Sequence, residues 1–313
     1  LMEVSGKKSE TLSAQDLGFS LGPRLNAAGR LDDMSLGIEC LLASSESSAR
    51  PKAEALCALN EERRAIEHSM REDALKQLET LPPLDEERPI ICLFHERWHQ
   101  GVVGIVASRI KERTHRPVIA FAINDLNPNE LKGSARSVSG VHIRDLIADV
   151  ATRHPDLIHR YGGHAMAAGL TLQRENLERF IQAVTEELQR SGEKAAATVT
   201  LRSDGELDGN DLNLSMATLI QDGGPWGQDF PEPLFDGRFV VLDQRIVGEK
   251  HLKMTLRPEN GDHLIDAIAF NLEHPGAWLR CRRLKAAYRL DINQFRGRSS
   301  PQLRIEYMEG QTE

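Results

Sequence analysis

The longest regular pattern in the sequence is a glycine-free stretch at residues 48–79. Five apolar side chains recur there at helical intervals among Glu, Arg and Lys: Leu56, Leu59, Ile66, Met70 and Leu78. Pro51 lies where the first turn of a helix tolerates proline. The pattern predicts one long amphipathic helix, either a strut between domains or one side of a helical bundle. It ends at "TLPPLDEERP", which has the composition of a linker.

Residues 89–190 alternate between short apolar runs and amphipathic stretches. Strands are predicted in "PIICLF", "RPVIAFAI", "LKGSARSV" and "MAAGLTL". Helices are predicted in "QGVVGIVASRIKER", "HIRDLIADVATR" and "NLERFIQAVTEELQR". The first strand, helix and second strand have the order and length of a βαβ unit. This part of the chain is therefore predicted to be an α/β domain.

From residue 197 the pattern changes to short alternating runs. These runs are "ATVTLRSDGEL", "GRFVVLDQRIVG", "HLKMTLRP", "HLIDAIAF", "RLKAAYRLDINQF" and "PQLRIEYM". Turn signals such as "DG", "ENGD" and "RGRSSP" separate them. Strands at this spacing predict a small closed barrel or a sandwich, with the oligonucleotide-binding (OB) barrel as the leading candidate. The helical stretch at residues 211–227 would lie on its rim.

Length and composition agree with a two-domain globular protein. The chain has 313 residues, of which 40% are hydrophobic and 27% charged. No apolar run is long enough to span a bilayer, and no secretory signal precedes the first helix, so we expect no membrane association. The four cysteines lie far apart without a CxxC pair, which argues against zinc and disulfides and favours the cytoplasm. Because the sequence begins at Leu1, we expect a fragment or a processed product.

The formal net charge of −8 argues against general nucleic-acid binding. Residues 279–304 differ, because they contain eight Lys or Arg and one acid, Asp291. Tyr288 and Phe295 lie in this basic stretch, where they could either stack on bases or fill a barrel core. Trp226, in "GGPWGQDFPEPLF", is predicted to be a structural plug rather than a platform for bases. We expect the basic stretch to attract phosphate.

Three short motifs have chemistry suited to binding phosphate. In the first, "GSARS", Ser134 and Arg136 are two residues apart on a predicted strand and so point to the same face. A hydroxyl beside a guanidinium makes a good phosphate clamp, because arginine donates two parallel hydrogen bonds and serine adds a third. The alternative is an ordinary solvated strand face.

The second motif is "YGGHAMAAG". Gly162 and Gly163 are predicted to form a tight turn that permits close approach and whose backbone N–H groups could hold an anion. His164 would then donate from its ring, and the alternative is a structural turn residue.

The third motif, "GPRLNAAGR", has turn character at its Gly-Pro pair and at Asn26. It offers Arg24, Asn26 and Arg30, and two small alanines would keep the surface low around these polar groups. The alternative is a loop that starts a helix, with both arginines in ordinary surface ion pairs.

The order of these motifs resembles a known family. "LGPRLNAAGRLDDM", "WHQGVVGIVASRI", "GSARS" and "YGGHAMAAG" follow one another as in the RecJ family, single-strand-specific 5′→3′ exonucleases of the DHH phosphoesterase superfamily. The resemblance covers essentially the whole chain. It implies four parts: the end of the catalytic core at 1–46, a connecting helix and linker at 47–84, an α/β DHH-associated domain at 85–194, and an all-β OB-fold nucleic-acid-binding barrel at 195–313.

The resemblance also implies a metal centre. In the family, two divalent cations, typically manganese, are held by Asp and His side chains of an N-terminal domain that includes an Asp-His-His triplet. The sequence contains no such triplet, and Asp262 and His263 in "GDHLID" lack further clustered ligands. We therefore expect this chain to be the substrate-binding part of the enzyme, inactive alone and without bound metal. Mn²⁺ or Mg²⁺ would be bound in the full-length enzyme.

Carried over residue by residue, the resemblance places Ser134 and Arg136 in a pocket for the 5′-terminal phosphate. Arg30 would complete this pocket, with Arg24 as the alternative, and Asn26 would contact the strand nearby.

The same resemblance places the Gly162-Gly163 pair close to the nucleic-acid backbone, with His164 as the catalytic residue that contacts the cleaved phosphodiester. His99, just before a predicted helix, could bind an anion there or be a capping or packing residue.

The barrel would bind the strand at a distance from the cut, with Arg280, Arg282 and Arg283 attracting the phosphate backbone. The expected partner is single-stranded DNA, in DNA repair and recombination, and the barrel could also dock a single-stranded-DNA-binding protein. Two alternatives stay open. One is a single-strand-binding module without activity of its own, and the other is a related DHH phosphodiesterase of short oligonucleotides or cyclic dinucleotides.

Overall fold

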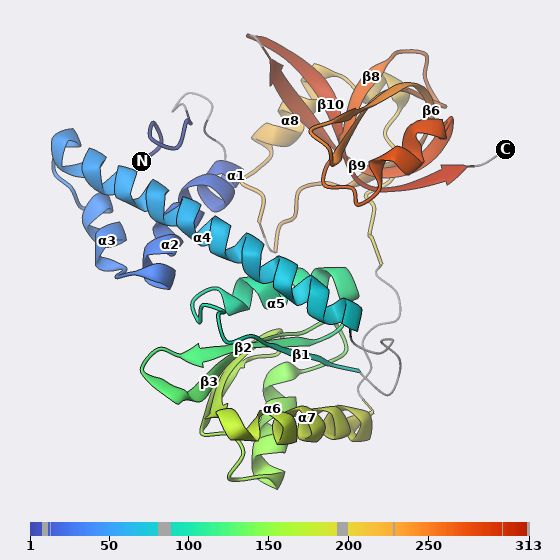
Figure 1. The fold of residues 1–313 in the computed structure, drawn as a ribbon. Helices are drawn as coiled ribbons and strands as arrows, with labels where there is room; N and C mark the ends of the chain where they lie inside the picture. Colours follow the sequence, from blue (N-terminus) through green and yellow to red (C-terminus); the bar gives the residue numbers. More distant parts are fainter. Residues whose placement is uncertain are drawn as a thin grey trace. The chain divides into compact units, whose positions relative to one another are not determined.

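The computed structural model describes residues 1–7, 12, 14–80, 89–192, 200–227, 229–295 and 297–311. The chain divides into two units, Leu1–Val199 and Thr200–Glu313. Figure 1 shows helices packed around one sheet in the first unit and a β-barrel in the second. Among the described residues, no helix is long and apolar enough to cross a lipid bilayer.

Short helices at the start of the first unit pack against one long helix. They are α1 (Ala14–Asp16), the π-helical η2 (Leu17–Leu21), α2 (Gly22–Leu31) and α3 (Ser35–Leu41). The turn predicted near Asn26 is wrong, because residues 22–31 form a continuous helix with its proline in the first turn. Ala27 and Ala28 are fully buried, and Ala28 packs with Leu56 in a small core. This burial is what makes the segment helical despite its turn-forming residues.

The long helix α4 (Glu46–Thr80) contains 35 residues and is therefore about 53 Å long. It begins two residues before the predicted position, so Pro51 lies in its second turn rather than its first. Its first half packs through Leu56 against the short helices, and its second half packs through Met70 and Ala74 against the α/β part. The first half therefore belongs to a helical bundle, one of the two predicted roles, and the second half packs on the sheet within the same unit (Figure 1).

A five-stranded sheet forms the centre of the α/β part, in the order β1-β2-β3-β5-β4. Its strands are β1 (Ile91–Phe94), β2 (Val118–Asn124), β3 (Asn127–Arg136), β4 (Arg160–His164) and β5 (Ala167–Gln173). β1 and β2 are parallel and joined by α5 (Val103–Thr114), which confirms the βαβ unit, and the other neighbours are antiparallel. α4 and α5 cover one face, while α6 (Ile143–Arg153) and α7 (Leu177–Ser191), which follows η3 (Arg174–Asn176), cover the other.

The second unit is a closed barrel with the strand order β10-β8-β7-β6-β9. Its strands are β6 (Phe235–Val247), β7 (His251–Pro258), β8 (Ile265–Ala269), β9 (Arg283–Phe295) and β10 (Arg298–Gln311). β10 closes the barrel by pairing with β8 in parallel, which decides between the predicted barrel and the sandwich. Buried residues alternate with less buried ones along β7 and β8, and Tyr288 and Phe239 fill the core.

Short helices accompany the barrel: η4 (Gly209–Asp211), α8 (Leu214–Asp222) and η5 (Pro275–Arg280). α8 packs against β9 and β10, as expected of the helical stretch in that region. The strand predicted at 197–207 is wrong for residues 200–207, which form neither helix nor strand, and residues 197–199 lie outside the described part.

Candidate nucleic-acid interface

Ser134 and Arg136 share the face of the sheet that packs against α5, as their spacing predicts. Arg136 donates from Nη1 to Ser134 Oγ over 3.1 Å and to the Ala135 carbonyl over 2.8 Å. Its Nε donates over 3.2 Å to the hydroxyl of Ser108 on α5, and this hydroxyl donates in turn to the Gly104 carbonyl over 3.1 Å. The guanidinium is therefore held by hydroxyls from two different elements.

Gly104 creates the space for this pair beneath the first turn of α5. A Cβ atom at Gly104 would lie 2.8 Å from Ser134 Oγ and 2.9 Å from Arg136 Nη2, which is closer than real Cβ atoms approach. The start of α5 also directs the positive end of a helix dipole toward this site. Sequence reasoning missed Gly104 and Ser108, whose only signal is a Gly and a Ser one turn apart on a predicted helix.

Arg30 adds a second cation to the site. It is exposed at the end of α2 and donates from Nη1 to the Gly101 carbonyl over 3.0 Å, just before α5. Burial lowers the pKa of Arg136 below its usual value, and the nearby charge of Arg30 lowers it further. Within the described residues, neither arginine pairs with a carboxylate. Two neighbouring cations without a counter-ion form a site that favours a bound anion.

The other polar residues of α2 differ in whether they lie on the same helix face as Arg30. Arg24 instead donates to Cys57 Sγ on α4 over 3.2 Å and to the Ser20 carbonyl over 2.6 Å. Asn26 is exposed one turn before Arg30, so the two share a helix face. The alanines between them point into the core, which corrects the expectation that they would keep the surface low.

The Gly-Gly-His segment is a strand, not the predicted tight turn. Residues 160–164 form β4 at the edge of the sheet, and the chain reverses at residues 165–166. Gly163 has φ +144°, and a Cβ there would lie 2.4 Å from the Ala167 carbonyl oxygen. Gly162 has no atom within 4 Å of the equivalent position, so its surface is open. Only Gly163 therefore requires glycine for its backbone.

Strand register brings the second motif, with Gly162 and His164, onto the same face of the sheet as the first. Ser134 pairs with Gly169, which pairs with Gly162, and Arg136 pairs with Ala167, which pairs with His164. Directly opposed residues point to the same side, and neighbouring strands lie about 4.8 Å apart. The Cα atoms of His164 and Arg136 are therefore about 10 Å apart. Gly162 and His164 are exposed, so this face offers an open glycine platform beside the two arginines.

His99 holds the loop before α5. Its Nδ1 accepts a hydrogen bond from the Gly101 N–H over 3.1 Å, and its carbonyl accepts from the Val102 and Val103 N–H groups. These contacts favour the capping role over direct anion binding.

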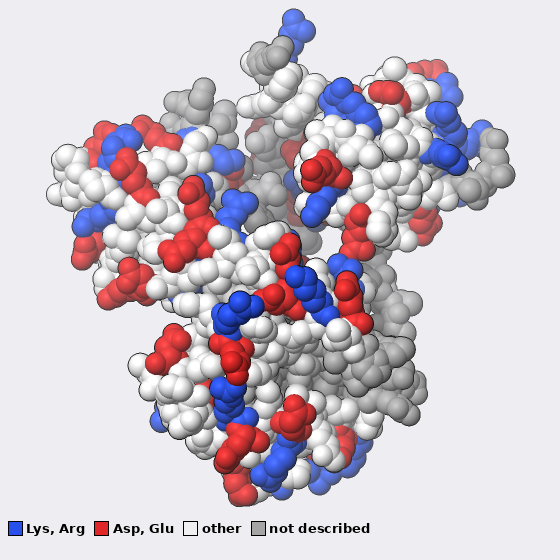
Figure 2. Space-filling view, viewed as in Figure 1, with Lys and Arg blue, Asp and Glu red and all other residues white. Residues whose placement is uncertain are grey.

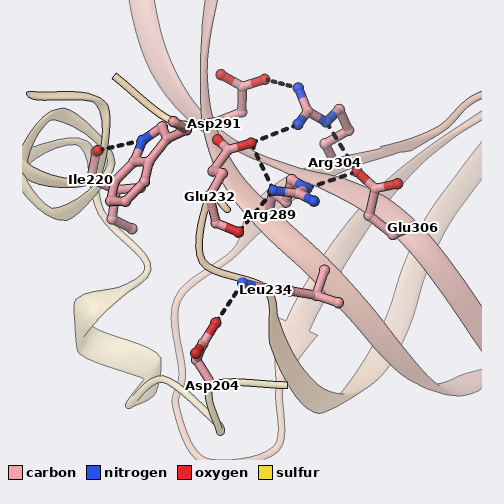
Figure 3. Close-up of polar contacts among 9 residues, drawn as sticks. Asp204, Ile220, Glu232, Leu234, Arg289, Asp291, Arg304 and Glu306 are labelled. Atoms are coloured by element: carbon pink, nitrogen blue, oxygen red, sulfur yellow. Dashed lines mark hydrogen bonds and ion pairs between the residues drawn. The ribbon is translucent and has the colours of Figure 1, made fainter. Parts of the chain in front are cut away.

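In the barrel, the basic stretch is not one uniform patch. Figure 3 shows Glu232 between Arg289 and Arg304, and its carboxylate accepts from both over 3.0 Å. Asp291 and Glu306 complete the network around these two arginines. Arg289 and Arg304 are thus neutralised, which corrects the expectation that the whole stretch attracts phosphate. Arg296 lies outside the described residues.

Arg280, Arg282 and Arg283 are exposed, and the described residues offer none of them a carboxylate partner. Tyr288 is fully buried, so it fills the core rather than stacking on bases, whereas Phe295 is 63% exposed.

Trp226 donates from its indole nitrogen to the Ile220 carbonyl over 3.1 Å and packs on Phe230, as a structural plug would.

Comparison with known proteins gives the family. Residues 87–190 match the DHHA1 domain, and residues 203–307 match the RecJ OB domain. The chain is 48% identical to the Salmonella typhimurium protein named single-stranded-DNA-specific exonuclease RecJ, over 98% of this chain and 53% of that protein. The Escherichia coli protein of the same name is 47% identical over 98% of this chain. The chain belongs to the RecJ family.

A solved structure of a RecJ supports the same conclusion. The fold resembles RecJ of Thermus thermophilus in complex with Mn²⁺ with a TM-score of 0.77 and 26% identity, covering all of this chain and 44% of that one. The DHH-associated domain and the OB barrel of the predicted fold are thus confirmed. The chain spans about half the length of the curated relatives it matches.

The described residues do not fit the metal centre of the RecJ family. They contain no group of three or more His, Cys, Asp or Glu side chains that could hold a metal ion, and Asp262 and His263 are not part of such a group. A two-metal site needs several carboxylates converging on the ions.

Proposed function

We propose that this chain is the substrate-binding part of a single-stranded-DNA-specific 5′→3′ exonuclease that acts in DNA repair and recombination. Ser134, Arg136 and Arg30 would bind the 5′-terminal phosphate, with Asn26 beside them. The main support is the pair of arginines without a carboxylate partner at the start of α5. A terminal phosphate carries more charge than an internal one and can accept from both guanidinium groups, which favours an end over the middle of a strand.

The glycine platform would hold the next part of the strand. Gly162 and Gly163 leave the face beside the pocket without bulky side chains, so a sugar–phosphate backbone could lie close to the sheet. His164, on the same face as Arg136, would contact the scissile phosphodiester from this side. Divalent cations, Mn²⁺ or Mg²⁺, would be held by side chains other than those described, as the metal-bound RecJ structures suggest.

The proposed division of the chain follows the same argument. Residues 1–46 would be the end of the catalytic core, and residues 47–84 would connect this core to the DHH-associated domain. Residues 85–194 would bind the end of the strand, and residues 195–313 would bind the strand farther along. The family matches at 87–190 and 203–307 support the last two parts. The match to the RecJ OB domain also favours the exonuclease over a phosphodiesterase of short oligonucleotides. A single-stranded-DNA-binding protein as partner, and a cytoplasmic location in keeping with four free thiols, belong to this proposal.

Blocking one end of the substrate tests the proposal. A full-length protein that contains this chain, supplied with Mn²⁺, should shorten a strand whose 3′ end carries a bulky group. It should leave a strand with a bulky 5′ end intact, because that end cannot enter the pocket. The opposite pattern, or equal digestion of both strands, would contradict the proposed role of the pocket.

A further inference from the structure

The barrel contains a pocket to which the proposed function assigns no particular part of the strand. It has a volume of about 710 Å³ and lies between η5, the start of β9 and the end of β10. Trp278, Leu272, Ala277 and Cys281 supply apolar lining, and Arg280, Arg282 and Arg283 line it as well. Sites for small ligands measure about 300–1,000 Å³ and combine apolar walls with a few polar groups. The pocket has the size and the composition of such a site.

Charge indicates what kind of ligand this pocket suits. Three arginines line it against one acid, Glu273. Elsewhere on the same barrel Arg289 and Arg304 are neutralised by Glu232, Asp291 and Glu306, so the fold does pair arginines where no ligand is needed. Acidic and basic side chains are also interspersed over the face shown in Figure 2. A local excess of arginine at an apolar pocket is therefore suited to a ligand with anionic and flat apolar parts.

Trp278 provides the flat surface. Trp278 is half-buried against the barrel core and lines the pocket together with Gly310. A Cβ at Gly310 would make ordinary contacts, 3.6 Å from Trp278 Cζ3 and 3.4 Å from Cys281 Sγ, so this strand position borders the ring and a larger side chain there would take up part of the pocket. Stacking on aromatic side chains is how proteins hold unpaired bases, and arginines hold the phosphates between them.

We propose that this pocket binds one unstacked nucleotide of a DNA strand, with its base against Trp278 and its flanking phosphates on Arg280, Arg282 and Arg283. The inference rests on the proposed function, since it takes the single strand as the ligand. It adds a base-binding subsite on the barrel that is separate from the terminal-phosphate pocket of the first unit. Because every base has a flat face, the subsite would hold any sequence.

The test compares strands with and without bases. The 313-residue chain is titrated with a short 5′-hydroxyl oligothymidylate and with an abasic strand of the same length. The 5′-hydroxyl removes the terminal phosphate from the comparison. Wild type should bind the oligothymidylate more tightly by roughly 5- to 100-fold, the usual effect of one stacked base. Trp278→Leu should bind it as weakly as the abasic strand, and its affinity for the abasic strand should not change.

Further variants separate a lost contact from a damaged fold. Gly310→Val fills the pocket without touching its charges and should also abolish the preference for bases. Arg282→Gln should weaken the binding of both strands alike. It should also lower the slope of log affinity against log salt concentration by about 0.7 for each lost phosphate contact. Tyr307→Leu removes an exposed aromatic ring outside the pocket and should behave as wild type.

Each result decides between the proposals. If wild type binds neither strand, the proposed function fails. If it prefers bases but Trp278→Leu and Gly310→Val keep that preference, the proposed function stands and the subsite is wrong. If an acidic peptide with a terminal phenylalanine binds wild type but not Trp278→Leu, while strand binding is equal in both, the pocket docks a protein and the subsite is also wrong.

Discussion

At the scale of single residues, two pairs of neighbouring arginines have opposite environments in this chain. Arg289 and Arg304 share the carboxylate of Glu232, whereas Arg30 and Arg136 lie close together without any carboxylate among the described residues. Holding two like charges together costs stability unless an anion enters. Hydroxyls hold the Arg136 guanidinium in place without neutralising it. The first pair is therefore structural, and we propose that the second pair binds an anion.

Gly104→Ala should separate the function of the phosphate site from its contribution to stability. Alanine is favoured over glycine inside a helix by about 1 kcal/mol, but its methyl group would displace Ser134 or Arg136. We expect the free energy of unfolding to stay within about 1 kcal/mol of wild type. The preference for 5′-phosphorylated over 5′-hydroxyl strands should fall by roughly tenfold, as for a lost charge-assisted contact.

Gly37→Ala is the matched control for this change. Gly37 is also helical, and a Cβ there would make only ordinary contacts of 3.6 Å or more. Urea unfolding and strand titrations on both variants measure the two effects. A Gly104→Ala protein that keeps the full preference for the phosphorylated strand would remove this glycine from the site.

At the scale of elements, the β4–β5 hairpin combines two glycines with different requirements. Gly163→Ala places a Cβ against the backbone of β5 at a positive φ. The free energy of unfolding of the first unit should therefore fall by about 1–3 kcal/mol. Gly162→Ala meets open space and should change stability by less than about 0.5 kcal/mol. It should nevertheless weaken strand binding, because the added methyl group would occupy the open face along which the strand would lie. Equal stability of the two variants in urea would contradict this account of the hairpin.

In the barrel, Glu232 joins β9 and β10 to the segment before β6. Glu232→Gln removes the carboxylate charge that Arg289 and Arg304 both contact, although Asp291 and Glu306 remain as partners. The network is partly exposed, so we expect a loss of about 1 kcal/mol in the unfolding of this unit. The exposed Glu259→Gln is the control and should leave unfolding unchanged. A Glu232→Gln barrel as stable as wild type in low salt would show that the network contributes nothing.

Sequence patterns predicted most elements, because helical and alternating periods reflect burial, which the fold then satisfies. They were wrong where local residue preference and burial disagree. The Gly-Pro and Asn26 of α2 favour a turn, yet two buried alanines make the segment a helix. The Gly162-Gly163 pair also favours a turn, but pairing with β5 makes it a strand. Ser134 and Arg136 followed from strand spacing, whereas Ser108 meets them only through packing of α5 on the sheet.

At the scale of the whole chain, binding and hydrolysis are expected to be separable. The described residues supply cations, hydroxyls and an open sheet face for a strand, and no cluster that could hold two metal ions. We expect the purified 313-residue chain to bind single-stranded DNA and to release no mononucleotides from it with Mn²⁺. Chromatography of a labelled strand after incubation measures this. Release of mononucleotides would contradict the expectation that this chain binds the strand without hydrolysing it.

The central claim is that Arg136 binds a terminal phosphate, and one two-by-two comparison tests it most directly. Dissociation constants are measured for wild type and Arg136→Ala, each with a 5′-phosphorylated and a 5′-hydroxyl strand. The variant should lose roughly ten- to a hundredfold in affinity for the phosphorylated strand and little for the other. Arg136→Lys should recover part of the loss, and His164→Ala should weaken both strands alike. An equal loss on both strands for Arg136→Ala would contradict the claim.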